Sequence, residues 1–160
     1  TSRVVLLDAE DGSVRTAWEA PAGMQVLETV WLGEELYASG LTEEGIGIYR
    51  LPDFRCVLPP RHVQVEALWS SDGRLLFTSD LSGVNELYAL APEDGSVVRL
   101  TTTRFGASDF EILRDSLFFS ALQPEGRLLE GQILFQQHHG SIRMRYFHPE
   151  PRSAAYGLLR

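Results

Sequence analysis

The chain has 160 residues, a formal net charge of −8 and a hydrophobic fraction of 44%. This length suits one domain with a substantial core, and the composition is that of neither a disordered nor a fibrous protein. No stretch approaches the roughly 18 apolar residues that cross a bilayer. The acidic balance, without any basic run, argues against a nucleic acid partner. We therefore expect no membrane span and no nucleic acid partner.

The first predicted elements are two strands between Val4 and Trp18, joined by the turn Glu10-Asp11-Gly12-Ser13-Val14. The three residues before them lead directly into an apolar segment that reaches an acid by Asp8, so we expect no signal peptide here. The same pentapeptide recurs at positions 93–97. Half of the spacing between the two copies indicates an internal repeat of about 41 residues.

A similar period appears at other positions of the chain. Leu36-Tyr37-Ala38-Ser39 is matched by Leu76-Phe77-Thr78-Ser79 and again by Leu117-Phe118-Phe119-Ser120. Tyr49 and Tyr88 have nearly the same spacing as these runs. Each repeat therefore predicts the same succession of strands. A unit of four strands in about 40 residues is typical of a β-propeller blade.

Local patterns favour strands over helices. The apolar run Arg74–Thr78 is bounded by Asp72-Gly73 and by Leu81-Ser82-Gly83, which is how a buried strand between turns reads. Asp-Gly supplies the positive φ of tight hairpins. Only Leu122–Gln137 has helical spacing, and Pro124 and Gly126 interrupt its start. The repeat predicts a long loop and a strand there instead.

The repeat positions predict an all-β fold with blades of four antiparallel strands. Residues 1–160 hold about three and a half blades, whereas closed propellers usually have about four to eight. A partial or unusually small propeller is therefore expected, and we interpret the chain as part of a larger protein. The expected segments are an outer half-blade over 1–20, blades over 24–58, 62–103 and 105–147, and a tail over 148–160.

The third of these segments resembles a known repeat. Its motif runs Trp69-Ser70-Ser71-Asp72-Gly73-Arg74-Leu75-Leu76-Phe77-Thr78-Ser79-Asp80, then Gly83, Asn85-Glu86-Leu87-Tyr88 and Arg99-Leu100-Thr101. This pattern is similar to the WD40-like (PD40) repeat of TolB-like propellers, W-S-P-D-G followed by a G-x-x-[DEQ]-[IL]-Y strand and R-L-T. Ser71 stands in place of the usual Pro. The second and fourth segments lack the S-P-D-G turn and match loosely.

The resemblance implies a function of a general kind. TolB-like propellers are interaction modules of the cell envelope, so it implies a non-enzymatic scaffold for a protein partner or ligand, in a periplasmic or other extracytoplasmic location. The same repeat occurs in propellers that gate prolyl-oligopeptidase-like (S9) serine peptidases, whose catalytic domain would lie outside this chain. A third alternative is a carbohydrate or small-molecule sensor. A downstream G-x-S-x-G segment favours the peptidase, and an upstream export signal without one favours the scaffold.

The sequence predicts no catalytic, cofactor-binding or metal-binding residue. No serine lies in a G-x-S-x-G elbow. Paired acids fall at predicted turns, where we interpret them as solvated, and the histidines at 138, 139 and 148 are interpreted as a solvated loop or strand edge, since adjacent strand residues point to opposite faces. Cys56 is the single cysteine, and we expect a small buried apolar side chain. The paired acids are Asp8 with Glu10-Asp11, Glu34-Glu35 and Glu43-Glu44.

Two surfaces are predicted to contact other chains. The longest expected irregular segment is Gln123–Gly131, and its residues Gln123, Pro124, Glu125 and Arg127 are the candidate contacts of a protein partner. An open propeller arc also exposes apolar strands at its two ends, which we place at Val4–Leu7 and Ile133–Phe135. Self-association through those edges is therefore expected.

Overall fold

The computed structural model describes residues 2–113, 116–124, 126–133 and 144–145, and the chain forms two compact units, Thr1–Thr102 and Thr103–Arg160. The described residues form strands joined by turns and contain no helix, so none of them belongs to a helix that spans a membrane. The expected all-β fold with antiparallel sheets is confirmed. These residues make four sheets, three of them four-stranded.

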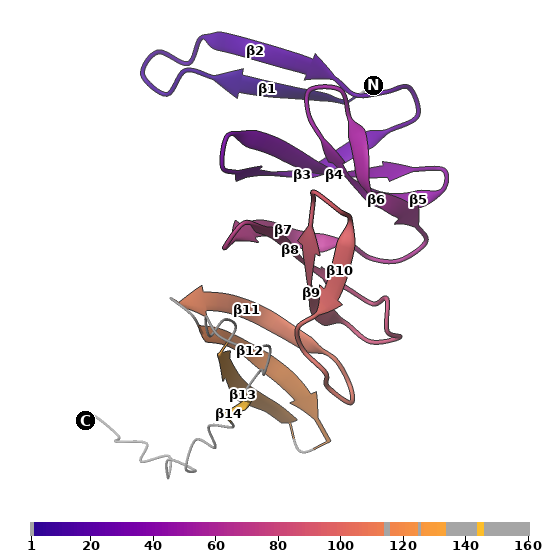
Figure 1. The fold of residues 1–160 in the computed structure, drawn as a ribbon, viewed down its shortest axis with the longest axis vertical. Helices are drawn as coiled ribbons and strands as arrows, with labels where there is room; N and C mark the ends of the chain where they lie inside the picture. Colours follow the sequence, from indigo (N-terminus) through magenta and orange to yellow (C-terminus); the bar gives the residue numbers. More distant parts are fainter. Residues whose placement is uncertain (1, 114–115, 125, 134–143, 146–160) are drawn as a thin grey trace, which may run out of the picture. The chain divides into compact units, whose positions relative to one another are not determined.

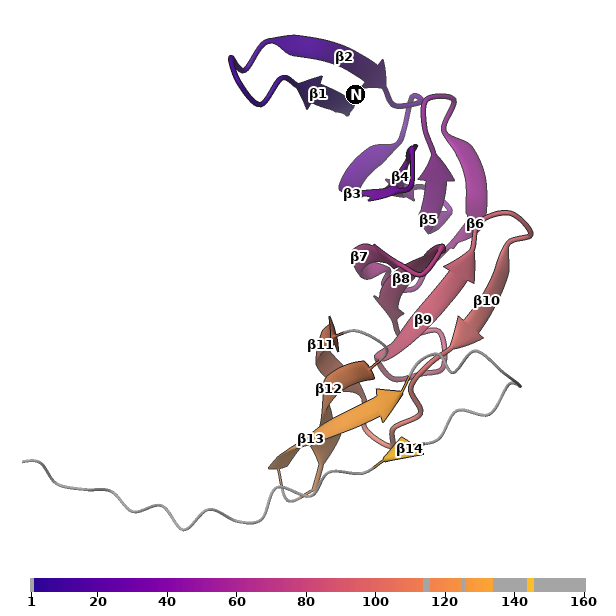
Figure 2. The ribbon, with the colours of Figure 1, turned by 60° about the vertical axis from the view of Figure 1, so that its left-hand side comes forward.

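The first unit holds three sheets, and in each of them strands that follow one another in sequence pair side by side (Figures 1 and 2). The first sheet is a hairpin, and the other two are four-stranded antiparallel meanders. The strands are β1 (Arg3–Leu7), β2 (Val14–Glu19), β3 (Gln25–Leu32), β4 (Glu35–Thr42), β5 (Gly45–Arg50), β6 (Arg55–Arg61), β7 (Glu66–Ser71), β8 (Arg74–Ser79), β9 (Glu86–Ala91) and β10 (Ser96–Arg99).

The predicted Asp-Gly turns form as the sequence requires. Asp72 and Gly73 have φ angles of 49° and 70°, and they join β7 to β8 directly because Ser71 pairs with Arg74. Positive φ at both central residues matches the right-handed twist of the flanking strands. Aspartate and glycine are among the few residues that adopt this conformation at low cost.

The two copies of Glu-Asp-Gly-Ser-Val form the same turn. Gly12 N–H donates to the Asp8 carbonyl at 2.9 Å in the first copy, and Gly95 N–H donates to the Ala91 carbonyl at 2.9 Å in the second. In both copies the aspartate before the glycine accepts the serine N–H at 2.8 Å. The turn of the hairpin β1–β2 therefore corresponds to the turn of the hairpin β9–β10, and the same five residues form the same local structure twice.

Apolar clusters hold the sheets of the first unit face to face. One cluster joins the β1–β2 hairpin to the sheet β3–β6, where Val4 and Trp18 pack against a buried group that includes Tyr49. A second cluster joins β3–β6 to β7–β10, with Tyr37 and Ile48 on one side and Phe77 on the other. Burial of such side chains contributes about 1.5–3 kcal/mol each, so these clusters stabilise the stack.

The sequence alignment of the repeats is wrong by one residue in this region. It equated Tyr37 with Phe77, but these side chains enter the shared cluster from opposite sheets. Ala38 pairs with Tyr49 and Phe77 pairs with Tyr88, so Ala38, and not Tyr37, is the structural equivalent of Phe77. A slip of one residue exchanges the two faces of a strand, and similarity between apolar runs does not fix that register.

The Arg-Leu-Thr end of the motif closes the sheet β7–β10 with a buried polar contact. The Thr101 hydroxyl accepts the Leu87 N–H at 2.9 Å and donates to the Glu86 carboxylate. Leu100 N–H also donates to the Leu87 carbonyl at 2.8 Å. Glu86 and Thr101 are fully buried. Both residues are therefore structural, and hydrogen bonding offsets the cost of burying them.

The second unit contains one described four-stranded sheet in the order β11-β12-β13-β14. Its β13 corrects the expected long loop, because Gln123 already pairs with Gly126 and pairing continues to Ile133. Pro124 lies in the turn, and Gly126 begins β13 with a positive φ of 134°, which glycine adopts without a steric cost. The strands are β11 (Ala107–Leu113), β12 (Ser116–Gln123), β13 (Gly126–Ile133) and β14 (Met144–Arg145).

The first strand of each described four-stranded sheet carries a β-bulge near its start. The register shifts between Val26 and Glu28 in β3, between Glu66 and Trp69 in β7, and between Ser108 and Glu111 in β11. Inside two of these bulges a non-glycine residue has positive φ, 51° at Ala67 and 53° at Asp109. Bulges bend a strand, leave a residue out of the ladder and occur often beside functional sites.

Candidate interaction surface

An open groove lies between β3 and β7, the first strands of neighbouring sheets in the first unit. The two strands lie next to each other in both views (Figures 1 and 2). The groove has a volume of about 510 Å³, which is within the roughly 300–1,000 Å³ of ligand sites. Both bulges open onto it. Its lining residues are Gln25, Val26, Leu27, Glu28, Val65, Glu66 and Ala67.

Two side-chain hydrogen bonds join β3 to β7 along this groove. The Glu28 carboxylate accepts the Leu68 N–H at 2.8 Å, and the Ser70 hydroxyl donates to the Trp31 carbonyl at 2.6 Å. Leu68 lies inside the β7 bulge, where the ladder to β8 is interrupted. Glu28 therefore supplies the acceptor that the bulge removes, and this contact fixes one carboxylate at the edge of the groove.

A buried hydroxyl lies beside Glu28. Ser39 pairs with Glu28 across β3 and β4, so the two side chains are on the same face of the sheet. The Ser39 hydroxyl is fully buried and has no hydrogen-bond partner in the described part of the chain. Burying an unsatisfied hydroxyl costs about 1–3 kcal/mol, so the Ser39 hydroxyl destabilises the folded sheet.

The predicted partner-contact residues lie on a hairpin of the second unit. Pro124 is exposed, and Gln123 is half-buried where it pairs with Gly126. Arg127 donates to the Ser108 hydroxyl at 3.0 Å and to the Asp109 carboxylate at 2.8 Å, which ties β13 to the bulge of β11. Glu125 lies outside the described residues. Whether this hairpin contacts a partner stays a prediction, but the segment is a hairpin and not irregular.

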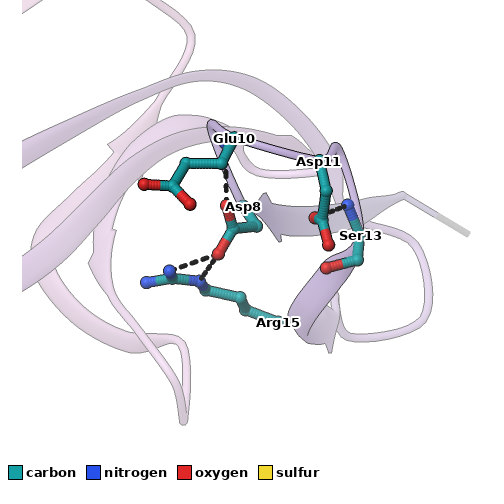
Figure 3. Close-up of polar contacts among 5 residues, drawn as sticks. All are labelled: Asp8, Glu10, Asp11, Ser13 and Arg15. Atoms are coloured by element: carbon teal, nitrogen blue, oxygen red, sulfur yellow. Dashed lines mark hydrogen bonds and ion pairs between the residues drawn. The ribbon is translucent and has the colours of Figure 1, made fainter.

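The acidic turn between β1 and β2 is satisfied by its own chain (Figure 3). The Asp8 carboxylate accepts the Glu10 N–H at 2.8 Å and the Arg15 Nε–H at 2.7 Å. These bonds, first that of Glu10 and then that of Arg15, hold the pKa of Asp8 below its usual value. A hydrogen bond from Ser13 likewise lowers the pKa of Asp11. Carboxylates held ionised in this way stabilise a turn and do not act as general acids near neutral pH.

The pair Glu34-Glu35 lies at the turn between β3 and β4, and Glu35 has structural partners. Its carboxylate accepts the Tyr37 hydroxyl at 2.6 Å and the Arg50 guanidinium at 2.8 Å. The Tyr37 bond and then the charge of Arg50 lower the pKa of Glu35. Burial, followed by the bond to Glu35, raises the pKa of Tyr37 to about 12. The exposed pair Glu43-Glu44 lies at the turn between β4 and β5.

The expected burial of Cys56 is wrong. The residue is exposed on β6, which lies at the edge of its sheet, whereas Val57 beside it is buried. Partial burial of the thiol and then the charge of Glu44 raise its pKa, so it is not activated as a nucleophile. The histidines at 138, 139 and 148 lie outside the described residues. No group of three or more potential metal ligands occurs in the ranges that the structure describes.

The apolar face predicted at the start of the chain is partly present. Val5 and Leu7 of β1 are exposed, as is Val14 of β2, while Val4 faces the buried cluster. Within the described residues β1 pairs with β2 alone. Ile133 belongs to β13, but its side chain and residues 134–135 lie outside the described part. Self-association through these strands stays a prediction.

Two comparisons with known proteins gave no match to this chain. No protein-family model matches it, and no curated protein matches it. The groove between β3 and β7 is thus characterised by its own chemistry, in which two carboxylates and one amide lie among apolar side chains. Sequence reasoning missed Glu28 and Glu66, because nothing in the pattern around them marks the first strands of two separate sheets as neighbours.

Proposed function

We propose that the chain is part of a β-propeller that acts as a non-enzymatic scaffold and binds a protein partner or ligand, in the manner of TolB-like cell-envelope propellers. The three sheets of the first unit stack through apolar clusters, and the recurring hairpin turns and bulges support the interpretation of the sheets as blades. An extracytoplasmic location is part of the same proposal, since it comes from the resemblance of the Trp69–Thr101 motif.

The observation that carries the proposal is the groove between β3 and β7. Its lining combines apolar side chains with a few polar groups that fix orientation, which is the usual composition of a binding site. The turn carboxylates of Asp8, Asp11 and Glu35 are bonded to backbone N–H groups or to an arginine, so these three have a structural role.

Site-specific photocrosslinking tests the proposal. A benzophenone amino acid is placed at Leu27 in the groove, at Pro124 on the predicted contact hairpin, and at Leu113 as an exposed apolar control. In the cells that make the protein, we expect Leu27 or Pro124 to capture a discrete protein or ligand that Leu113 does not capture. Capture of nothing, or of a second copy of this chain alone, would contradict partner binding.

Labelling with a fluorophosphonate tests the non-enzymatic part separately. We expect no labelling of this chain, because no serine lies in a nucleophile elbow. Labelling that a single Ser→Ala substitution abolishes would identify a serine hydrolase instead. That outcome would contradict the non-enzymatic proposal, whereas the absence of labelling is expected both of the scaffold and of a peptidase-gating propeller, whose catalytic domain would lie outside this chain.

A further inference from the structure

The charged residues that line the groove between β3 and β7 are all negative. Glu28 and Glu66 are the charged residues of its lining, and both are acidic. They come from the two strands that line the groove, Glu28 from β3 and Glu66 from β7. The remaining lining is the Gln25 amide with the apolar side chains of Val26, Leu27, Val65 and Ala67.

The Glu28 carboxylate is held at the edge of the groove by a hydrogen bond. One oxygen, Oε2, accepts the Leu68 N–H at 2.8 Å, which fixes the carboxylate without neutralising it. A carboxylate accepts about four hydrogen bonds through its two oxygens, so Glu28 retains capacity for a donor in the groove.

We propose that this groove binds an arginine side chain of a partner polypeptide, which gives the proposed scaffold a defined site and rests on that function. The guanidinium lies between Glu28 and Glu66, and its planar set of five donors suits two carboxylates on facing walls. The aliphatic part of the side chain lies along Leu27 and Ala67. The net charge of −8 adds long-range attraction for a basic partner.

Peptide binding tests the site directly. The probe is acetyl-Ala-Arg-Ala-Arg-Ala-amide, compared with the same peptide carrying citrulline, which keeps the shape of arginine without its charge, or lysine. Binding to the full chain is followed by amide chemical shifts. We expect the arginine peptide to shift the amides of Leu27, Ala67 and Leu68, the citrulline peptide to show no binding, and the lysine peptide to bind more weakly.

Variants separate a built site from general attraction. Glu28→Gln and Glu66→Gln should each weaken binding of the arginine peptide about tenfold, the size of a lost charge-assisted hydrogen bond. Glu43→Gln removes the same charge from an exposed turn and should change the affinity less than twofold. Glu28→Gln keeps an acceptor for the Leu68 N–H, and unchanged urea unfolding midpoints check that all three variants fold.

Three results would overturn the inference. They are equal weakening by Glu43→Gln, binding of the citrulline or lysine peptide as tight as that of the arginine peptide, and shifts that avoid β3 and β7. If the peptide does not bind while Leu27 still captures a partner by photocrosslinking, the arginine site is wrong and the scaffold proposal stands. If Leu27 and Pro124 capture nothing while the peptide binds as expected, the failure is that of the scaffold.

Discussion

The sheets β3–β6 and β7–β10 have the same strand order, but they differ at one residue pair that joins their second and third strands. In β7–β10 the pair Ser79 and Glu86 joins the second and third strands, and the Glu86 carboxylate is bonded to Thr101. At the positions that strand pairing makes equivalent, β3–β6 has the pair Gly40 and Gly47. One sheet thus holds a buried polar network where the other has no side chain.

The glycines of β3–β6 allow the backbone to come close. A Cβ atom on Gly47 would lie 2.7 Å from the Leu58 carbonyl oxygen, and one on Gly45 would lie 2.0 Å from the Arg61 carbonyl oxygen. The strand β6 therefore packs against β5 at a distance that only glycine permits. Sheets with the same strand order can thus be held together either by close approach of the backbones or by buried hydrogen bonds. The Glu86 and Thr101 contact of β7–β10 is therefore not needed in β3–β6.

The largest effect is expected for Gly45→Ala. The new methyl group would clash with the backbone at Arg61, and the φ of +113° would strain any L side chain. We expect the free energy of unfolding to fall by about 3 kcal/mol or more, measured by urea denaturation. Gly83→Ala is the matched control, because its φ is +94° but nothing lies within 4 Å, and it should cost about 1–2 kcal/mol. Equal losses would contradict the close approach.

The second prediction compares two buried hydroxyls. Thr101→Val keeps the side-chain shape but leaves the Leu87 N–H and the Glu86 carboxylate without this partner, so we expect a loss of about 3 kcal/mol. Ser39→Ala removes a hydroxyl that is buried without a partner in the described chain, so stability should rise, by at most about 1–3 kcal/mol. Thermal unfolding of both variants measures the difference. If Thr101→Val leaves the stability unchanged, the buried hydrogen bonds do not hold β7–β10 together, and the proposed distinction between the two sheets is wrong.

The smallest effect concerns Tyr37, which β3–β6 contributes to the cluster shared with β7–β10. Its pKa of about 12 in the folded protein exceeds the ordinary value of 10, so folding favours the protonated phenol. This contribution to stability is present below pH 10 and is lost as the pH rises from about 10 to 12. Absorbance titration at alkaline pH, with Tyr37→Phe as the reference, should show a phenol that ionises near pH 12.

Glu35→Gln refines the same measurement. Burial is the larger cause of the raised pKa and the bond to Glu35 the next, so this variant should lower the pKa of Tyr37 while leaving it above 10. If the phenol that Tyr37→Phe removes titrates with an ordinary pKa, Tyr37 is neither buried nor bonded as described.

Much of the fold was predictable because turns carry local signals. Asp72-Gly73 specified a two-residue hairpin, and the repeated pentapeptide specified two identical turns, since these residues favour the required φ values. The expected loop over Gln123–Gly131 is wrong because β13 already begins at Gly126. The predicted strand was placed too late in the chain, although Pro124 and Gly126 are typical of a turn. Local chemistry therefore located the turns better than it located the strands that they join.

Features that depend on distant contacts could not be predicted in this way. The face on which Tyr37 lies depends on register, and a one-residue slip is invisible in an apolar run. Ala67 in the β7 bulge has a positive φ, which non-glycine residues rarely adopt. The Glu28 carboxylate that supports this bulge comes from a different sheet. The groove exists only because the two sheets stack, so no local pattern marks it.

The two apolar clusters have a consequence for how the first unit is held together. The sheet β3–β6 contributes residues to both clusters, whereas the β1–β2 hairpin and the sheet β7–β10 contribute to one each. Loss of β3–β6 therefore removes both sets of contacts, while separation of the hairpin removes only the set that covers Tyr49 and Met24. The sheet β3–β6 is thus the element on which the cohesion of the first unit depends most.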